Sequence, residues 1–172
     1  MLIDRDGTLN VEKQYLSHPD QLEFIPGSAQ ALKRLEDRGI GVCVLTNQSA
    51  IARGYFDQAQ LNKVHERLVK LLANYGVALK GIYYCPHAPD DNCDCRKPMP
   101  GMIFRAMADH HFNASHAWVI GDKESDVQMG RAVGAKTILV RTGYGKEFEP
   151  FTRADYVVDD LSAAVELILS SA

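Results

Sequence analysis

The chain opens with MLIDRDGTLN (residues 1–10), in which an apolar stub runs directly into two aspartates and a Gly-Thr pair. Asp4 and Asp6 stand on either side of one residue, a period-two spacing that can aim both side chains the same way at the end of a strand. Gly7 permits an abrupt turn immediately after them. Because two carboxylates this close repel each other, we expect a cation between them. The stretch therefore predicts a first strand whose carboxyl end borders a charged ligand site.

The rest of the chain alternates apolar runs with helical patterns. The predicted strands are residues 2–3, 40–46, 81–85, 117–122, 136–142 and 156–158, and the predicted helices are 28–39, 57–76, 101–109, 125–133 and 161–169. Several of the apolar runs show no alternation, as expected when helices cover both faces of a parallel sheet. The pattern predicts one α/β domain over residues 1–172, with a doubly wound, mostly parallel sheet and right-handed crossovers. The gaps between strands and helices are too short for a separate cap domain.

The composition argues against several functional classes. With 46% hydrophobic and 24% charged residues among 172, the chain is an ordinary globular protein. Its net charge of −3 argues against a general binder of nucleic acid or of membrane surfaces. No apolar run approaches the roughly 20 residues that a membrane span needs, and no signal peptide is visible. We therefore expect a cytoplasmic protein, by default a monomer, that acts on a small molecule.

Polar residues with catalytic potential follow several predicted strands, where ligands of doubly wound sheets bind. These residues are Asp4, Asp6, Thr46 and Asp122. Mg²⁺ suits the carboxylates best, because it takes few protein oxygens and completes its shell with phosphate and water. One of the paired aspartates can act as nucleophile and the other as general acid and base. Thr46 and Lys97 can stabilise a transferred phosphoryl group. A D-x-D-G sequence by itself is also an ordinary turn, but the later residues favour the catalytic interpretation.

Three of the four cysteines and one histidine form the pattern C-x-H-x₅-C-x-C, made of Cys85, His87, Cys93 and Cys95. Three thiolates and an imidazole suit a structural Zn²⁺ ion with no open coordination position. The ion would fix the zinc loop, residues 85–97, and so aim Arg96 and Lys97 at the active site. The alternatives are reduced cysteines beside a surface histidine, a disulfide formed on oxidation, and an iron–sulfur cluster.

In combination, these motifs resemble the haloacid dehalogenase superfamily of phosphohydrolases, which has a Rossmann-like fold. The resemblance covers nearly the whole chain through DRDGT at 4–8, Thr46, Lys97 and GDKESD at 121–126. It implies that Asp4 is the nucleophile that forms an aspartyl-phosphate and that Asp6 is the general acid and base. It also implies Mg²⁺ bound by the Asp4 side chain, the Asp6 main-chain carbonyl and Asp122. Asp126 either supports the metal indirectly or caps the helix that begins near Ser125.

Within the superfamily, three stretches are similar to the heptose-1,7-bisphosphate 7-phosphatases: TNQSAIARGYF (46–56), RKPMPGM (96–102) and VRTGYGK (140–146). The resemblance implies hydrolysis of the 7-phosphate of D-glycero-D-manno-heptose 1,7-bisphosphate, on the route to ADP-heptose and the lipopolysaccharide core. The alternative is a histidinol-phosphate phosphatase of histidine biosynthesis, which shares the short spacing between His87 and Cys93.

The resemblance also implies substrate contacts, namely Glu12, Lys13, Gln14, Tyr15, Asn47, Gln48, Ser49, Arg96 and Lys123. On electrostatic grounds, Arg53 and Lys146 are further candidates for contact with a second phosphate; the alternative is that both are solvated surface charges.

Three departures from the heptose enzymes stand out. Ala50 replaces the usual glycine, so the loop is shifted if that position requires a positive φ. Residues 12–15 read EKQY where the heptose enzymes have a sequence like DHGY. The apolar stub before Asp4 has only three residues, so we expect a trimmed start of the chain or a fragile first strand.

Overall fold

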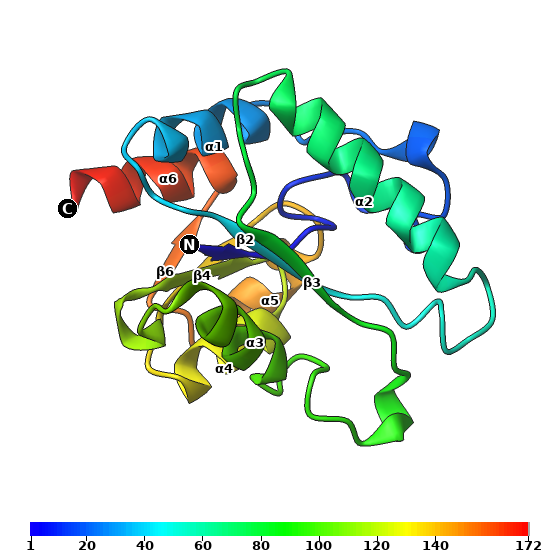
Figure 1. Cartoon of the computed structure of the whole chain (residues 1–172). Helices are drawn as coiled ribbons and strands as arrows, with labels where there is room; N and C mark the ends of the chain where they lie inside the picture. Colours follow the sequence, from blue (N-terminus) through cyan, green and yellow to red (C-terminus); the bar gives the residue numbers. More distant parts are fainter. Residues whose placement is uncertain (172) are drawn as a thin grey trace.

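The computed structural model describes residues 1–171 and contains a parallel sheet of six strands between two layers of helices (Figure 1). The strands are β1 (Leu2–Ile3), β2 (Cys43–Asn47), β3 (Gly81–Cys85), β4 (Trp118–Gly121), β5 (Lys136–Val140) and β6 (Tyr156–Val158). Their order is β3-β2-β1-β4-β5-β6, and each neighbouring pair is parallel. This is the order of a doubly wound sheet, which confirms the predicted fold class.

The five helices predicted from the sequence are all present, and one short helix follows β5 in addition. The helices are α1 (Ser28–Glu36), α2 (Gln58–Ala73), α3 (Gly101–His110), α4 (Glu124–Ala132), α5 (Gly145–Phe148) and α6 (Leu161–Ser170). Asp57 caps α2, because its side chain accepts from the Gln60 N–H at 2.8 Å. Among residues 1–171, none of the helices has both the length and the apolar character that crossing a membrane requires.

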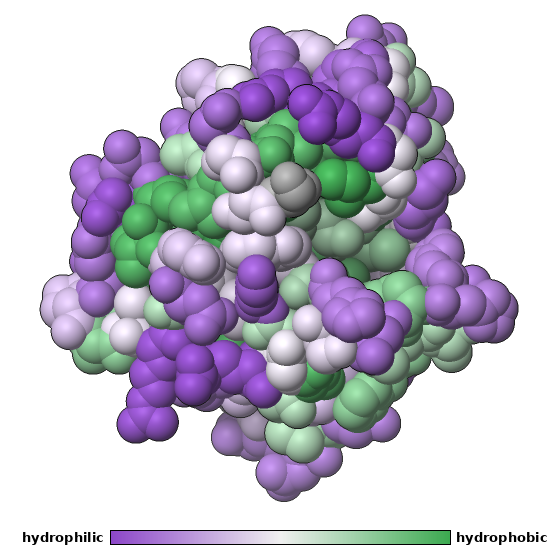
Figure 2. Space-filling view, turned by 90° about the vertical axis from the view of Figure 1, so that its left-hand side faces the viewer, coloured by the Kyte–Doolittle hydropathy of each residue, from purple (hydrophilic) through white to green (hydrophobic). Residues whose placement is uncertain are grey.

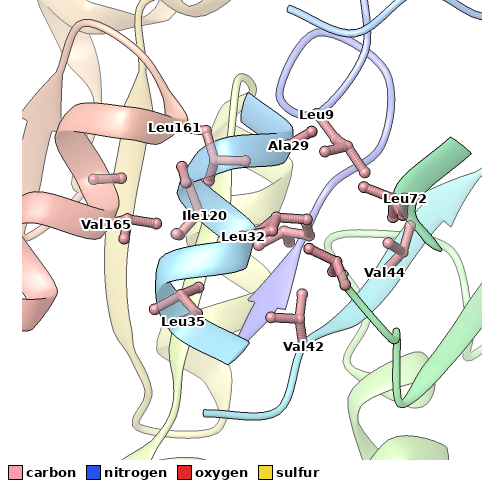
Figure 3. Close-up of a cluster of buried hydrophobic side chains, with 14 of the residues drawn as sticks. Leu9, Ala29, Leu32, Leu35, Val42, Val44, Leu72, Ile120, Leu161 and Val165 are labelled. Carbon is pink, nitrogen blue, oxygen red and sulfur yellow. The ribbon is translucent and has the colours of Figure 1, made fainter. Parts of the chain in front are cut away.

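Two apolar layers hold the helices against the sheet. On one face, α1, α2 and α6 pack on Val44 and Ile120 of the strands, with Leu32 of α1 fully buried in the centre (Figure 3). On the other face, α3 and α4 pack on Leu45 and Val119. Full burial of one such aliphatic side chain contributes about 1.5–3 kcal/mol. Coverage of both faces explains why these strands lack an alternating pattern.

The first strand is short but central. Leu2 and Ile3 are buried, and β1 pairs with β2 on one side and with β4 on the other. The N–H of Asp4 extends this pairing, because it donates to the carbonyl of Ile120 at 2.9 Å. Strand β2 begins at Cys43 rather than at residue 40 because Cys43 is the partner of Leu2 in the register. From β1 the chain adds β2 and β3 on one side of the sheet, and it then crosses to the other side to add β4, β5 and β6. Ligands of such sheets bind at the carboxyl ends of the strands where the direction changes, here between β1 and β4.

A second cavity, of about 510 Å³, lies at the opposite, amino-terminal ends of the strands. Figure 2 faces this side of the molecule, where apolar side chains gather in patches between polar ones. The lining of this second cavity includes Leu2 and Cys43, at the starts of β1 and β2, and Phe112 and His116, in the segment before β4. This cavity is remote from the strand ends that carry the predicted catalytic residues.

Candidate active site

A cavity of about 560 Å³ lies at the carboxyl ends of the central strands and collects most of the predicted site residues. Those in its lining are Asp4, Asp6, Glu12, Gln14, Tyr15, Thr46, Asn47, Gln48, Ser49, Arg53, Arg96, Lys97 and Lys123. Lys13 is placed elsewhere, because its Nζ pairs with Glu23 at 3.2 Å on the surface. Lys146 is exposed on α5. The sequence did not point to Tyr144 or Ser125, which also line the cavity.

Lys97 joins two buried carboxylates in this cavity. Its Nζ donates to Asp4 Oδ1 at 2.7 Å and to Asp126 Oδ1 at 2.6 Å. Burial alone would lower the pKa of Lys97, but the charges of Asp126 and Asp4 outweigh it and raise the pKa. Asp126 also caps α4, because its Oδ2 accepts from the main-chain N–H of Lys123 at 3.1 Å. The interpretation of Asp126 as a helix cap is thus correct. Its other oxygen, Oδ1, binds Lys97, a contact that the sequence did not indicate.

Asp6 is held by a separate group of donors. Asn10 Nδ2 donates to its Oδ1 at 2.9 Å, and Gln48 Nε2 donates to its Oδ2 at 3.1 Å. Arg5 Nη2 lies 2.8 Å from the same Oδ2, and Arg5 Nε donates to it at 3.0 Å. Burial raises the pKa of Asp6, but the Arg5 charge and these hydrogen bonds outweigh it, so the pKa is lowered. Each of the paired aspartates therefore has its own protein cation, Lys97 for Asp4 and Arg5 for Asp6.

A metal ion fits the carboxylates beside Asp4. Carboxylate oxygens of Asp4, Asp122 and Asp126 lie within 4.8 Å of one another. Asp122 Oδ1 is buried and has no hydrogen-bond partner among residues 1–171. Burial, followed by the charges of Asp4 and Asp126, raises the pKa of Asp122 to about 8. A crowded, unsatisfied set of hard oxygen donors is what Mg²⁺ binds. The side chain of Asp6 lies outside this group, which leaves its main-chain carbonyl as the predicted ligand.

Gly7 makes room for the Asp122 carboxylate. Its φ is +83°, and a Cβ atom there would lie 2.3 Å from Asp122 Oδ2. The same oxygen accepts from the main-chain N–H of Tyr144 at 2.8 Å. The glycine of the opening motif therefore serves both the turn after β1 and the close approach of a predicted metal ligand.

The cysteine cluster has the geometry of a zinc site. Cys95 Sγ lies 3.0 Å from Cys85 Sγ and 3.6 Å from Cys93 Sγ, and His87 Nδ1 lies 3.2 Å from Cys95 Sγ. Four ligands at about 2.0–2.3 Å around one tetrahedral Zn²⁺ lie roughly 3.3–3.8 Å apart, so these atoms are close enough together for one ion to bind them all. Burial raises the pKa of both Cys85 and Cys95, so a cation is needed to hold them as thiolates. Arg96 Nη1 donates to the carbonyl of His87 at 3.3 Å, so a contact within the zinc loop orients Arg96, which lines the active-site cavity.

Replacing Cys93 by serine is expected to reduce the zinc content from about one ion per chain. We expect faster proteolysis within the zinc loop and a loss of activity that exceeds the loss of thermal stability, because the loop carries Arg96 and Lys97. Metal analysis, limited proteolysis and phosphate release measure these effects. Cys43→Ala, a buried cysteine of β2 outside the cluster, is the control. Full activity in a zinc-free preparation would contradict a positioning role for the metal.

Two of the departures from the heptose enzymes, at residues 12–15 and at Ala50, lie in loops whose backbone conformation the structure shows. Gln14 has φ = +61°, a conformation that favours glycine, and glycine is the residue that the resemblance to the heptose enzymes implies at this position. The Gln14 N–H donates to Glu12 Oε1 at 2.6 Å. Tyr15 packs edge-on against Tyr55, with ring centroids 4.8 Å apart, at the rim of the cavity. Ala50 is buried and is not among the residues with positive φ, so the loop after β2 forms without a glycine there.

Replacing Gln14 by glycine is expected to stabilise the protein by about 1 kcal/mol, because the left-handed conformation is strained for a residue with a Cβ atom. Urea unfolding measures the change. The matched control is Gln128→Gly, in the exposed interior of α4, where glycine is expected to destabilise by about 1 kcal/mol. Equal signs for the two substitutions would contradict the assignment of strain to Gln14.

The chain is similar to a family of hydrolases over part of its length and to individual phosphatases over nearly all of it. The HAD-hydrolase-like family model matches residues 94–164. The D-glycero-beta-D-manno-heptose-1,7-bisphosphate 7-phosphatase of Pseudomonas aeruginosa is 42% identical over 173 residues, covering 98% of this chain and 97% of that protein. The enzyme of the same name from Escherichia coli K12 is 41% identical and covers 94% of this chain and 89% of its own. A solved structure of D,D-heptose 1,7-bisphosphate phosphatase from B. bronchiseptica, complexed with magnesium and phosphate, is 36% identical with a TM-score of 0.95, covering 100% of this chain and 98% of that one.

Proposed function

This chain belongs to the HAD-like hydrolases and, within them, to the family of heptose-1,7-bisphosphate 7-phosphatases, and we propose that it hydrolyses the 7-phosphate of D-glycero-D-manno-heptose 1,7-bisphosphate. The observation that carries this proposal is full-length similarity to enzymes of that name, together with a cavity that gathers Asp4, Asp6 and Lys97. The product belongs to the route toward ADP-heptose and the lipopolysaccharide core.

In the proposed reaction, Asp4 attacks the phosphorus and forms an aspartyl-phosphate. Lys97 donates to Asp4 Oδ1, which leaves Oδ2 as the attacking atom. Lys97 and the Thr46 hydroxyl face the equatorial phosphoryl oxygens, where negative charge develops. Mg²⁺ held by Asp4, Asp122 and the Asp6 carbonyl supplies further charge compensation when bound.

Asp6 acts at the leaving group and then on water. Because its pKa is lowered, Asp6 rests as a carboxylate, and in the first step it passes a proton from the bound phosphate monoanion to the sugar oxygen as the P–O bond breaks. In the second step it takes a proton from the water that attacks the aspartyl-phosphate. Gln48 bonds both Asp6 and, at 2.8 Å, the Thr46 hydroxyl, so it links the general acid to the phosphoryl pocket.

The sugar and its second phosphate occupy the outer part of the cavity in this proposal. Arg53, Arg96 and Lys123 supply positive charge there. Lys123 is oriented by Glu12, at 3.6 Å, and by the ring of Tyr144, whose centroid lies 4.5 Å from Nζ. These contacts hold the Lys123 ammonium group at the cavity, where the second phosphate can reach it in this proposal.

The test is phosphate release, with Mg²⁺, from heptose 1,7-bisphosphate and from histidinol phosphate side by side. We expect a strong preference for the bisphosphate, and phosphorus NMR is expected to show loss of the 7-phosphate with the 1-phosphate retained. The reverse preference would overturn the proposal in favour of histidine biosynthesis, while the Asp4 chemistry would stand.

We further propose that the enzyme works as a monomer in the cytoplasm. The proposed substrate is a free sugar phosphate, and a zinc site made of Cys85, His87, Cys93 and Cys95 requires reduced thiols, which a reducing compartment favours. Sedimentation at working concentration tests the oligomeric state, and a dimer would contradict this part of the proposal.

A further inference from the structure

A buried histidine, His65, contacts the arginine that holds Asp6, the proposed general acid and base. It lies on α2, none of whose residues line the active-site cavity. His65 lies on α2, about 9% exposed, and its Nε2 is 3.1 Å from Arg5 Nη1. Arg5 is completely buried, which is rare for an arginine. Its other two nitrogens, Nε and Nη2, both reach Asp6 Oδ2. The guanidinium thus joins α2 to the carboxylate after β1.

The histidine is an acceptor in this chain of contacts. Burial, followed by the neighbouring charge of Arg5, lowers the pKa of His65 to about 3, so the ring is neutral at any working pH. Arg5 has donors only, so a neutral ring with its lone pair on Nε2 is the form that fits the 3.1 Å contact. The ring also lies 5.8 Å, between centroids, from that of Tyr84, and so it is held on a second side.

We propose that His65 is a positioning residue, which holds the Arg5 guanidinium so that its Nε and Nη2 fix the carboxylate of Asp6 for proton transfer to the leaving group. This inference rests on the proposed role of Asp6. Without the acceptor on His65, the buried Nη1 loses its partner, and an unpaired buried donor is costly. The guanidinium then turns toward another acceptor, and Asp6 loses the geometry that proton transfer requires, where small displacements have large effects.

The dependence on the leaving group separates this role from a general effect on the fold. A sugar phosphate expels an alkoxide and needs the proton from Asp6, whereas p-nitrophenyl phosphate expels a stable phenolate and does not. The ratio kcat/KM reports only the steps up to the departure of the leaving group. The later action of Asp6 on water therefore does not affect this ratio. For His65→Asn we expect kcat/KM to fall by roughly 10–100-fold with heptose 1,7-bisphosphate and by less than about 3-fold with p-nitrophenyl phosphate.

His65→Gln is the matched rescue variant, because its amide oxygen reaches about as far as Nε2 whereas that of asparagine falls short. We expect it to recover most of the lost kcat/KM on the sugar phosphate. His65→Leu, which has no acceptor, is expected to behave as His65→Asn does. Val64→Ala, at a buried residue of α2 in the apolar core, is the control for destabilisation and is expected to affect both substrates equally.

Equal losses on the two substrates for His65→Asn, or a His65→Gln variant no better than His65→Asn, would overturn the inference. If the wild type does not cleave heptose 1,7-bisphosphate at all, the proposed substrate is wrong. In that case the same comparison with glycerol 3-phosphate, another alkyl phosphate, still tests the positioning role.

Discussion

Asp4→Asn is expected to abolish turnover, with kcat lowered by at least about 10⁴-fold, the order of loss seen when a covalent nucleophile is removed. The amide has nearly the same shape as the carboxylate but cannot attack phosphorus. Acid quenching during turnover, followed by mass spectrometry, is expected to find phosphate on the wild-type chain and none on the variant. Phosphate release gives the rate.

The control for this substitution is Asp20→Asn, an exposed aspartate in the short 3₁₀ turn Pro19–Gln21, which is expected to keep full activity. Thermal unfolding checks that Asp4→Asn is folded. Turnover within about tenfold of the wild type would exclude Asp4 as the nucleophile, whichever phosphate ester is the substrate, because an amide cannot form the acyl phosphate.

The sequence predicted those parts of the structure that depend on local pattern. Unbroken apolar runs and helical patterns located the strands and helices, and the doubly wound order then placed Asp4, Thr46 and Asp122 at one edge of the sheet. The zinc ligands were visible because they fall within one short loop with metal-ligand spacing. In each case, neighbours in the sequence carry the information.

Contacts between distant segments were not predictable in this way. Arg5 and His65 are 60 residues apart, and nothing in either local pattern indicates that a buried arginine joins α2 to Asp6. The contact of Lys97 with Asp126 joins the zinc loop to the start of α4 in the same manner. The resemblance implied Lys13 as a substrate contact, and its pairing with Glu23, ten residues further along the chain, is another contact that the local pattern did not indicate.

Lys97→Met is expected to be the most destabilising single substitution at the site, by about 3–5 kcal/mol, since it removes one partner of a buried ion pair. The methionine keeps most of the volume of the side chain, but Asp4 and Asp126 are left buried without their cation. Urea unfolding in the absence of divalent ions measures the effect. We also expect activity to be lost, because the site loses the buried positive charge beside Asp4.

The pH dependence of the stability that Lys97→Met loses gives a sharper test. Even with Lys97 present, burial raises the pKa of Asp126 to about 6 and that of Asp122 to about 8, above the values of these groups in the unfolded chain. Removing the lysine raises the pKa of its partner carboxylates further, so the folded variant binds more protons than the unfolded chain between about pH 4 and 8. Its stability must therefore increase as the pH falls, and the deficit relative to the wild type is expected to shrink from pH 8 to pH 5.

Adding Asp126→Asn to Lys97→Met removes one of the two uncompensated carboxylates and is expected to recover part of the lost stability at pH 8. The amide can still accept from the main-chain N–H of Lys123, so the cap of α4 is retained. The single variant Asp126→Asn is the control. It measures the effect of the amide on stability while Lys97 is present and still paired with Asp4. If the double variant is less stable than Lys97→Met, the penalty does not arise from uncompensated charge, and the lysine must act through packing of its side chain instead.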